Sequence, residues 1–350
     1  MTDNNIYTRQ MAILIFLSST VIKLSSLPAL WAMEISTSVF LAMIIMSVIE
    51  IIIFCLVYVF VQADGIKMLD ETKVKYPICI ALYLYFFAKL FTFMAFVANF
   101  ISNFMFDSIS LYILIITIIV PVVYLGIKGM RSIARSGEFF VIFSVICYFL
   151  LLAFLEADFD FGRLKPFLAI DSTAFLKSGF SYGLWFGDAL PFIFVTVKKS
   201  KKAVLPVTII LTYTLICVVL MLSVAIFGDA IVIADNLLVN LSMFNQLSSV
   251  LGRLQWLSIV PWLFGSYLEC GMLFWAMTES GMRIVGKKVP VIVFSALALT
   301  IPYMAMKRYD FIIENTSGIL GYVMFAAMIL IVVSILIVLN VRRRKNAKAI

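Results

Sequence analysis

The sequence predicts an all-α polytopic membrane protein with ten transmembrane helices. Of its 350 residues, 64% are hydrophobic and only 13% are charged, whereas a soluble domain is close to half apolar. Apolar runs of about 20 residues, the length that crosses the hydrocarbon core of a bilayer, recur along the whole chain. Two of these runs are interrupted at corresponding places in the two halves, which is typical of an inverted-repeat transporter fold. We therefore expect one integral membrane domain over residues 1–350, with inverted repeats at about 8–156 and 175–341.

The ten predicted spans follow one another with short connections. They cover residues 10–31, 36–62, 77–106, 110–127, 137–156, 175–197, 203–228, 254–282, 290–306 and 317–341. The third run is longer than one perpendicular crossing requires, so we expect that helix to be tilted. No connection is long enough for a soluble catalytic domain, and the chain has no histidine and no paired cysteine motif. We predict no enzymatic activity, no cofactor and no metal site.

Both interruptions contain residues that disfavour a continuous helix. The first consists of Lys23, Ser25, Ser26 and Pro28, and the second of Gly179, Gly183, Gly187, Asp188 and Pro191. Backbone that leaves a helix inside the bilayer loses hydrogen bonds that lipid cannot replace, so it is tolerated only where it is buried in protein or lines a cavity. The two interruptions therefore predict a binding site near the middle of the membrane.

The distribution of basic residues predicts the orientation. With the N-terminus in the cytoplasm, 19 of the 27 lysines and arginines fall in cytoplasmic segments and five on the opposite side. This asymmetry obeys the positive-inside rule and indicates an even number of spans with both termini cytoplasmic. The net charge of +8 lies in short loops beside the bilayer, so we expect no nucleic-acid partner.

Five ionisable residues lie near the centres of predicted spans: Lys23, Glu50, Lys89, Asp188 and Glu269. A central charge costs about 2.5–3.5 kcal/mol to insert, and such residues usually pair or serve a function. The charges of these two cations and three anions nearly cancel. Pairing for stability and a role in ligand or proton binding both stay open, and Glu50 has mainly apolar neighbours at helical spacing.

Two spans also carry polar faces at helical spacing. The third span presents Lys89, Thr92, Phe96, Asn99 and Asn103, and the eighth presents Ser258, Trp262, Gly265 and Glu269. A polar stripe of this kind faces protein or a water-filled path rather than lipid. Lys89 is the most specific candidate, either as a ligand for a carboxylate or as a proton carrier.

The ensemble resembles the amino acid–polyamine–organocation (APC) transporter superfamily. Within it, the chain is similar to the spore germination permease family, the B subunits of GerA-type germinant receptors. The resemblance is carried by KLSSLP at 23–28, RSGE at 135–138, GDALP at 187–191 and RLQW at 253–256, and extends over residues 5–342. One departure is clear, because the glycines that the family places in the first span are replaced here by Val21 and Lys23.

The resemblance implies a central pocket lined by spans one, three, six and eight. The implied ligand-binding residues are Lys23, Ser25, Ser26, Lys89, Thr92, Gly183, Gly187, Asp188, Trp262 and Glu269, with Glu50 and Asn99 surrounding them. It also implies A-type and C-type (lipoprotein) receptor subunits as partners, and location in the inner membrane of a bacterial spore.

Three functions are compatible with these features. The leading hypothesis is a transporter-like receptor subunit that binds a small nutrient, an amino acid, at the bilayer midplane and triggers germination. The ammonium of the nutrient would face Asp188 or Glu269, and the carboxylate of the nutrient would face helix N-termini and a lysine. The second is a proton-coupled amino acid permease of the APC superfamily. The third is an ion-conducting channel subunit lined by the polar stripe of the third span.

Overall fold

The fold is described from a computed structural model. It describes residues 5–72, 74–105, 110–153, 155, 159–164, 172–198, 204–234, 236–243, 255–305, 312 and 318–347. The first two residues of the RLQW segment, 253–254, and residues 199–202 of the basic segment after the sixth predicted span lie outside the described residues.

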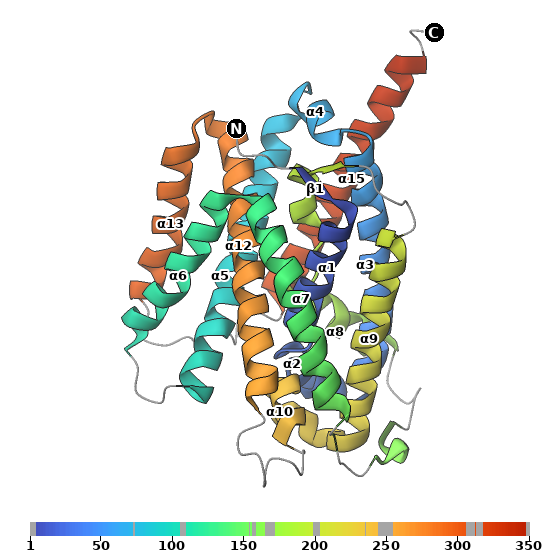
Figure 1. Cartoon of the computed structure of the whole chain (residues 1–350). Helices are drawn as coiled ribbons and strands as arrows, with labels where there is room; N and C mark the ends of the chain where they lie inside the picture. The colour runs from blue at the N-terminus through green and yellow to red at the C-terminus, as the bar shows by residue number, and fades with distance from the viewer. Residues whose placement is uncertain are drawn as a thin grey trace.

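Helices account for nearly all of the described chain (Figure 1). Their bounds are α1 Thr8–Lys23, α2 Leu27–Ile35, α3 Val39–Gln62, α4 Gly65–Asp70, α5 Lys75–Phe104, α6 Leu111–Lys128, α7 Met130–Ala153, α8 Ser172–Ser181, α9 Val204–Phe227, α10 Leu237–Met243, α12 Trp256–Val285, α13 Lys288–Ala305 and α15 Ile319–Ala347. Among these residues, six segments are long and apolar enough to cross a membrane, and two shorter apolar helices lie at 112–128 and 288–304. The chain is therefore a helical, polytopic membrane protein.

Helix α12 occupies the centre of the bundle. It packs against α5, α6 and α7, and 72% of its apolar stretch is buried, compared with 22% for α7. Helix α1 packs against α9 and α7, and α15 against α5, α8 and α3. The interior is thus built from α1, α5 and α12, while α7 presents most of its surface outward, where lipid would cover it.

Both predicted interruptions are present. Helix α1 ends at Lys23, and α2 starts at Leu27 with Pro28 in its first turn, where proline's missing N–H removes no hydrogen bond. Helix α8 ends at Ser181 and is followed by short 3-10 turns, η3 (Gly183–Trp185) and η4 (Leu190–Phe194). Between these turns the backbone is extended at Phe186 and left-handed at Gly187, with φ +84°.

The second half of the predicted sixth span is not an α-helix, and here the expectation was wrong. After Ser181 the chain continues through the 3-10 turns into a short strand, β2 (Thr196–Lys198), which pairs in parallel with β1 (Asn5–Tyr7). Gly187 and Pro191 both oppose α-helical continuation here, the first through its positive φ and the second through its missing N–H. The backbone groups of 196–198 find partners on the N-terminal segment instead. The purely helical prediction therefore missed this two-stranded ribbon.

The two ends of the described chain lie toward the same end of the bundle. Figure 1 shows β1 and the C-terminal end of α15 both near its top, with α2 and α10 near the opposite end. This arrangement is the one that an even number of membrane crossings produces.

A buried charge cluster at the two chain interruptions

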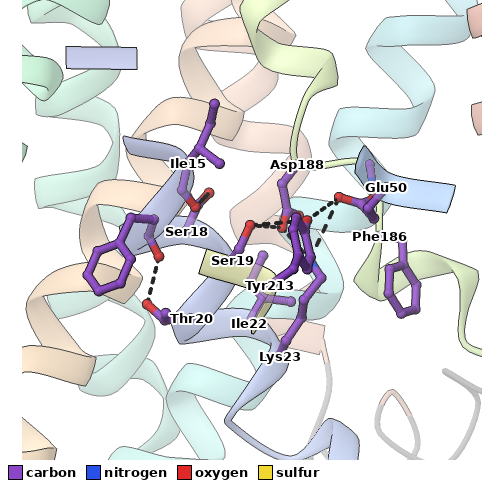
Figure 2. Close-up of polar contacts among 12 residues, drawn as sticks. Ile15, Ser18, Ser19, Thr20, Ile22, Lys23, Glu50, Phe186, Asp188 and Tyr213 are labelled. Carbon is purple, nitrogen blue, oxygen red and sulfur yellow. Dashed lines mark hydrogen bonds and ion pairs between the residues drawn. The ribbon is translucent and has the colours of Figure 1, made fainter. Parts of the chain in front are cut away.

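Asp188 is the centre of a buried polar cluster between the two interruptions (Figure 2). Its Oδ1 accepts a hydrogen bond from Lys89 Nζ at 2.7 Å. Its Oδ2 accepts from Lys23 Nζ and from Ser19 Oγ, the latter at 2.9 Å. Lys23 and Asp188 are fully buried and Lys89 is 2% exposed. One carboxylate thus binds two ammonium groups from different helices.

Glu50 of α3 joins the cluster directly. Its Oε1 accepts a hydrogen bond from the backbone N–H of Gly187, and its Oε2 accepts one from the Tyr213 hydroxyl at 2.7 Å. Lys23 Nζ lies 3.9 Å from Oε2. Expected outside the pocket, Glu50 instead contacts the second interruption itself. With all four groups ionised, Lys23, Lys89, Asp188 and Glu50 carry no net charge.

The extended backbone at Phe186 is also held by side chains. Its carbonyl accepts hydrogen bonds from Lys89 Nζ and from the Tyr85 hydroxyl, both at 2.7 Å. The Phe186 ring stacks on Trp31, with centroids 5.9 Å apart, and lies 5.2 Å from Lys23 Nζ. Side chains from other helices therefore replace the helical hydrogen bonds that this segment lacks, as the apolar environment requires.

The first interruption is satisfied mostly within its own chain segment. Leu24 N–H donates to Thr20 O at 3.1 Å, and the Ser25 hydroxyl donates to Ile22 O at 2.8 Å. The Ser26 carbonyl accepts from Leu30 N–H at 3.1 Å. The Ser25 hydroxyl and the Ser26 carbonyl thus hold the turn, and ligand binding by these two residues stays a prediction.

Trp262 and Gly265 of α12 pack against the end of α1. The Trp262 indole N–H donates to the Val21 carbonyl at 3.2 Å, and a Cβ added to Gly265 would overlap Val21 Cγ2. The Val21 side chain is therefore accommodated by a glycine on the facing helix.

The two glycines predicted at the site have different surroundings. Gly187 adopts a left-handed φ of +84°, and a Cβ there would overlap the Tyr85 hydroxyl. A Cβ on Gly183 would overlap Phe325 of α15. Gly187 thus belongs to the charge cluster, while Gly183 allows the η3 turn to approach α15.

A small cavity adjoins Lys89, which is the one charged residue among the described residues of its lining. It is lined by Ile22, Lys89, Thr92, Phe93, Leu184 and Trp185, and offers about 10 Å³ for the centre of a water molecule. That volume is close to the minimum for a single water. The site is therefore closed around its own side chains in this conformation. Asn99 is half-buried and lies about 15 Å further along α5 from Lys89.

Glu269 of α12 is the one predicted charge that the cluster does not bind. It is 1% exposed, and neither of its carboxylate oxygens has a hydrogen-bond partner among the described residues. It is near enough for its charge to interact with those of Lys89 and Asp188. The structure therefore separates the two carboxylates that the sequence left as equivalent candidates.

Four further residues of the cluster were missed: Ser19, Tyr85, Phe186 and Tyr213. Tyr85 precedes Lys89 by one helical turn, so extending the polar stripe toward the N-terminus would have found it. Ser19 and Tyr213 are single polar residues in apolar helices, and the contact of Phe186 is made by its backbone, which leaves no signal in the side-chain pattern. No group of three or more potential metal ligands occurs in the part of the chain that the structure describes.

Comparison with protein-family profiles gives a match over most of the chain. The profile of a family described as spore germination protein, a spore permease family, matches residues 5–312. No curated protein matches the chain.

Proposed function

We propose a function that proceeds from one premise: the chain belongs to the spore germination protein family. It acts as the membrane-embedded, transporter-like subunit of a spore nutrient germinant receptor. It binds a small nutrient, an amino acid, near the bilayer midplane, and this binding triggers germination. Its partners are the A-type subunit and the C-type lipoprotein subunit, in the inner membrane of the spore, and it acts by binding rather than by catalysis.

The proposed architecture is a five-plus-five inverted repeat with both termini in the cytoplasm. Ten crossings would be made by α1 with α2, by the interrupted segment from α8 to η4, and by α3, α5, α6, α7, α9, α12, α13 and α15. The position of β1 and the end of α15 toward one end of the bundle supports an even number. The basic residues that lie in the predicted cytoplasmic segments support the orientation.

The observation that carries the proposal is the buried charge cluster at the two interruptions. Four ionised side chains and an unwound backbone segment are costly in a membrane, and a well-packed apolar core of the same volume is often at least as stable. A protein that only had to span the bilayer would have no need of them. They are the elements from which a site for a charged, polar ligand is made.

Spores that lack this chain test the receptor role. Each proteinogenic amino acid is supplied singly, and germination is followed by the fall in optical density of the spore suspension. We expect the deletion to abolish the response to at least one amino acid, and re-introduction of the wild-type gene to restore it. An unchanged response of the deletion strain to every amino acid would contradict the proposal.

A proton-coupled amino acid permease is the second candidate, and Glu269 favours it. A buried carboxylate without a partner is a typical proton-binding group in transporters. Uptake of a labelled amino acid into vesicles that contain the purified chain, with and without a pH gradient, separates the two. Accumulation that depends on the gradient supports the permease, whereas binding without accumulation supports the receptor.

A further inference from the structure

The three buried carboxylates of the site differ in how many donors they already bind. Asp188 accepts from Lys23, Lys89 and Ser19. Glu50 accepts from the Gly187 N–H and the Tyr213 hydroxyl. Both oxygens of Glu269 are without a partner among the described residues. An incoming ammonium group therefore finds free acceptors on Glu269, whereas Asp188 already binds two lysines and a hydroxyl.

The cavity beside Lys89 offers the complementary chemistry. The Trp185 indole N–H is buried and has no acceptor in the described part of the chain. Lys89 makes two hydrogen bonds, and an ammonium has three N–H groups. The Thr92 hydroxyl also lies in the cavity wall, and the rest of the wall is apolar. Although Lys89 already binds Asp188, its third N–H and the Trp185 N–H have no acceptor among the described residues, so the cavity suits an anionic group.

The two sets of groups are neighbours in the fold. Glu269 lies one helical turn after Gly265, on the face of α12 that packs against Val21. The next residue of α1, Ile22, lines the cavity. Helix α12 also packs along α5, which carries Lys89 and Thr92. An acceptor for a cation and donors for an anion thus stand on adjacent helices beside the first interruption.

We infer that the site binds a small zwitterion in one orientation, with its ammonium on Glu269 and its carboxylate in the cavity formed by Lys89, Thr92 and Trp185. This rests on the proposed function and assigns the two ends of the ligand, leaving Asp188 as a partner of the protein's own lysines. Because the cavity now admits about one water molecule, the ligand enters by widening it. Small amino acids are the ligand class that carries both charges and needs the least widening.

The experiment measures binding to the purified full-length chain in lipid nanodiscs. Each proteinogenic amino acid is tested singly for stabilisation against thermal unfolding. For the one that stabilises most, affinities are then measured for the amino acid, its carboxylate-only analogue and its amine-only analogue. We expect the amino acid to bind about tenfold or more tightly than either analogue, because each analogue leaves one charged partner unsatisfied.

Two substitutions test which protein groups bind the ammonium and the carboxylate of the ligand. Glu269→Gln removes a charge that has no partner, so the variant should fold, and it should lose about tenfold affinity for the amino acid but little for the carboxylate-only analogue. Trp185→Phe should weaken the binding of the amino acid and of the carboxylate-only analogue, and leave the binding of the amine-only analogue unchanged. Glu279→Gln is the matched control, since Glu279 lies on the same helix but is bound to Arg283 at 3.0 Å.

Three outcomes would overturn the inference. They are stabilisation by no amino acid, unchanged affinity of Glu269→Gln for the amino acid, and equal binding of the amino acid and the carboxylate-only analogue by the wild type. The germination phenotype of spores that lack the chain is measured separately. If the receptor role survives while either of the last two outcomes is found, the orientation of the ligand is wrong and the proposed function stands. Stabilisation by no amino acid would instead contradict amino acid binding by this chain, which is part of the proposed function.

Discussion

The two interruptions replace their missing helical hydrogen bonds in different ways. In the first, Leu24, the Ser25 hydroxyl and Ser26 bond to residues within four positions of themselves, the Ser25 carbonyl accepts from Leu237 N–H at 3.4 Å, and α2 resumes the helix at once. In the second, the groups that hold the backbone come from other helices: Tyr85 and Lys89 from α5 bind the Phe186 carbonyl, and Glu50 from α3 binds the Gly187 N–H.

This difference identifies the part of the site that a ligand can change. The first interruption is held mainly by hydrogen bonds within its own segment, with two uncharged donors from other helices, the Leu237 N–H on the Ser25 carbonyl and the Trp262 indole on the Val21 carbonyl. The second depends on charged side chains, and a charged ligand competes for those same side chains. A ligand carboxylate that draws Lys89 away from the Phe186 carbonyl would release the second interruption and leave the first in place.

The largest expected effect comes from removing Lys23, whose ammonium lies within ion-pair distance of both carboxylates of the cluster. Lys23→Met leaves one surplus buried negative charge and should destabilise the protein by about 3–5 kcal/mol. Combining it with Glu50→Gln restores neutrality and keeps the Lys89–Asp188 pair, so the double variant should be more stable than Lys23→Met alone. Thermal unfolding of the purified variants measures this. Additive effects of the two changes would show that Lys23 and Glu50 do not interact.

Gly187 should be the next most sensitive position. Alanine there must adopt a left-handed φ, which costs about 1–3 kcal/mol, and its Cβ would also displace Tyr85. Gly179→Ala is the control within the same predicted span, because its Cβ meets only Met46, at 3.6 Å or more. We expect reduced stability and ligand response for Gly187→Ala and neither for Gly179→Ala. Equal behaviour of the two variants would exclude a special role for Gly187.

Packing at the end of the first interruption predicts a compensating pair. Gly265→Ala should cost about 1–3 kcal/mol through its overlap with Val21. Val21→Ala removes the overlapping methyl group and should recover most of that stability in the double variant. A double-mutant cycle in thermal unfolding gives the coupling, and a coupling near zero would mean that the backbone shifts freely to admit the extra methyl.

The smallest expected effect compares single hydroxyl groups at the two interruptions. Tyr85→Phe removes one of two hydrogen bonds to the Phe186 carbonyl and should cost about 0.5–1.5 kcal/mol. Ser25→Ala removes a bond at the first interruption, where main-chain bonds remain. Amide hydrogen exchange around Gly187 should accelerate in Tyr85→Phe and stay unchanged around Leu24 in Ser25→Ala. The reverse pattern would contradict the contrast between the two regions.

The sequence predicted the helical membrane fold and both interruptions because each rests on local chemistry. The length of an apolar run indicates a membrane span. Pro28, Gly187 and Pro191 indicate helix breaks through their own backbone preferences. Lys23, Lys89 and Asp188 stood out for a similar reason, since charge at the centre of an apolar run is conspicuous in one dimension.

What the sequence could not predict depends on contacts between distant segments. The β1–β2 ribbon joins residues almost 200 positions apart, and neither strand has a strand-like pattern of its own. The Phe186 carbonyl is a backbone group, so the residue type at this position does not indicate that it accepts hydrogen bonds from Tyr85 and Lys89. Asp188 and Glu269 were equivalent as candidate acceptors, and only their surroundings distinguish the carboxylate that binds two lysines from the one without a partner among the described residues.

The germination response of spores that carry Lys89→Arg tests the central claim most directly. Arginine keeps the positive charge for Asp188, but its planar guanidinium cannot reproduce the two bonds of a compact ammonium to Asp188 and the Phe186 carbonyl, nor can it release a proton. Lys75→Arg is the control, because Lys75 lies on the same helix and pairs with Asp70 at 3.1 Å, away from the cluster.

We expect Lys89→Arg to accumulate at the wild-type level and to lose most of its response to the nutrient. Lys89→Ala should lose the whole response, and Lys75→Arg should keep it. A full response from Lys89→Arg would contradict the claim that ligand binding acts through Lys89 on the second interruption, and would leave Lys89 with a structural role alone.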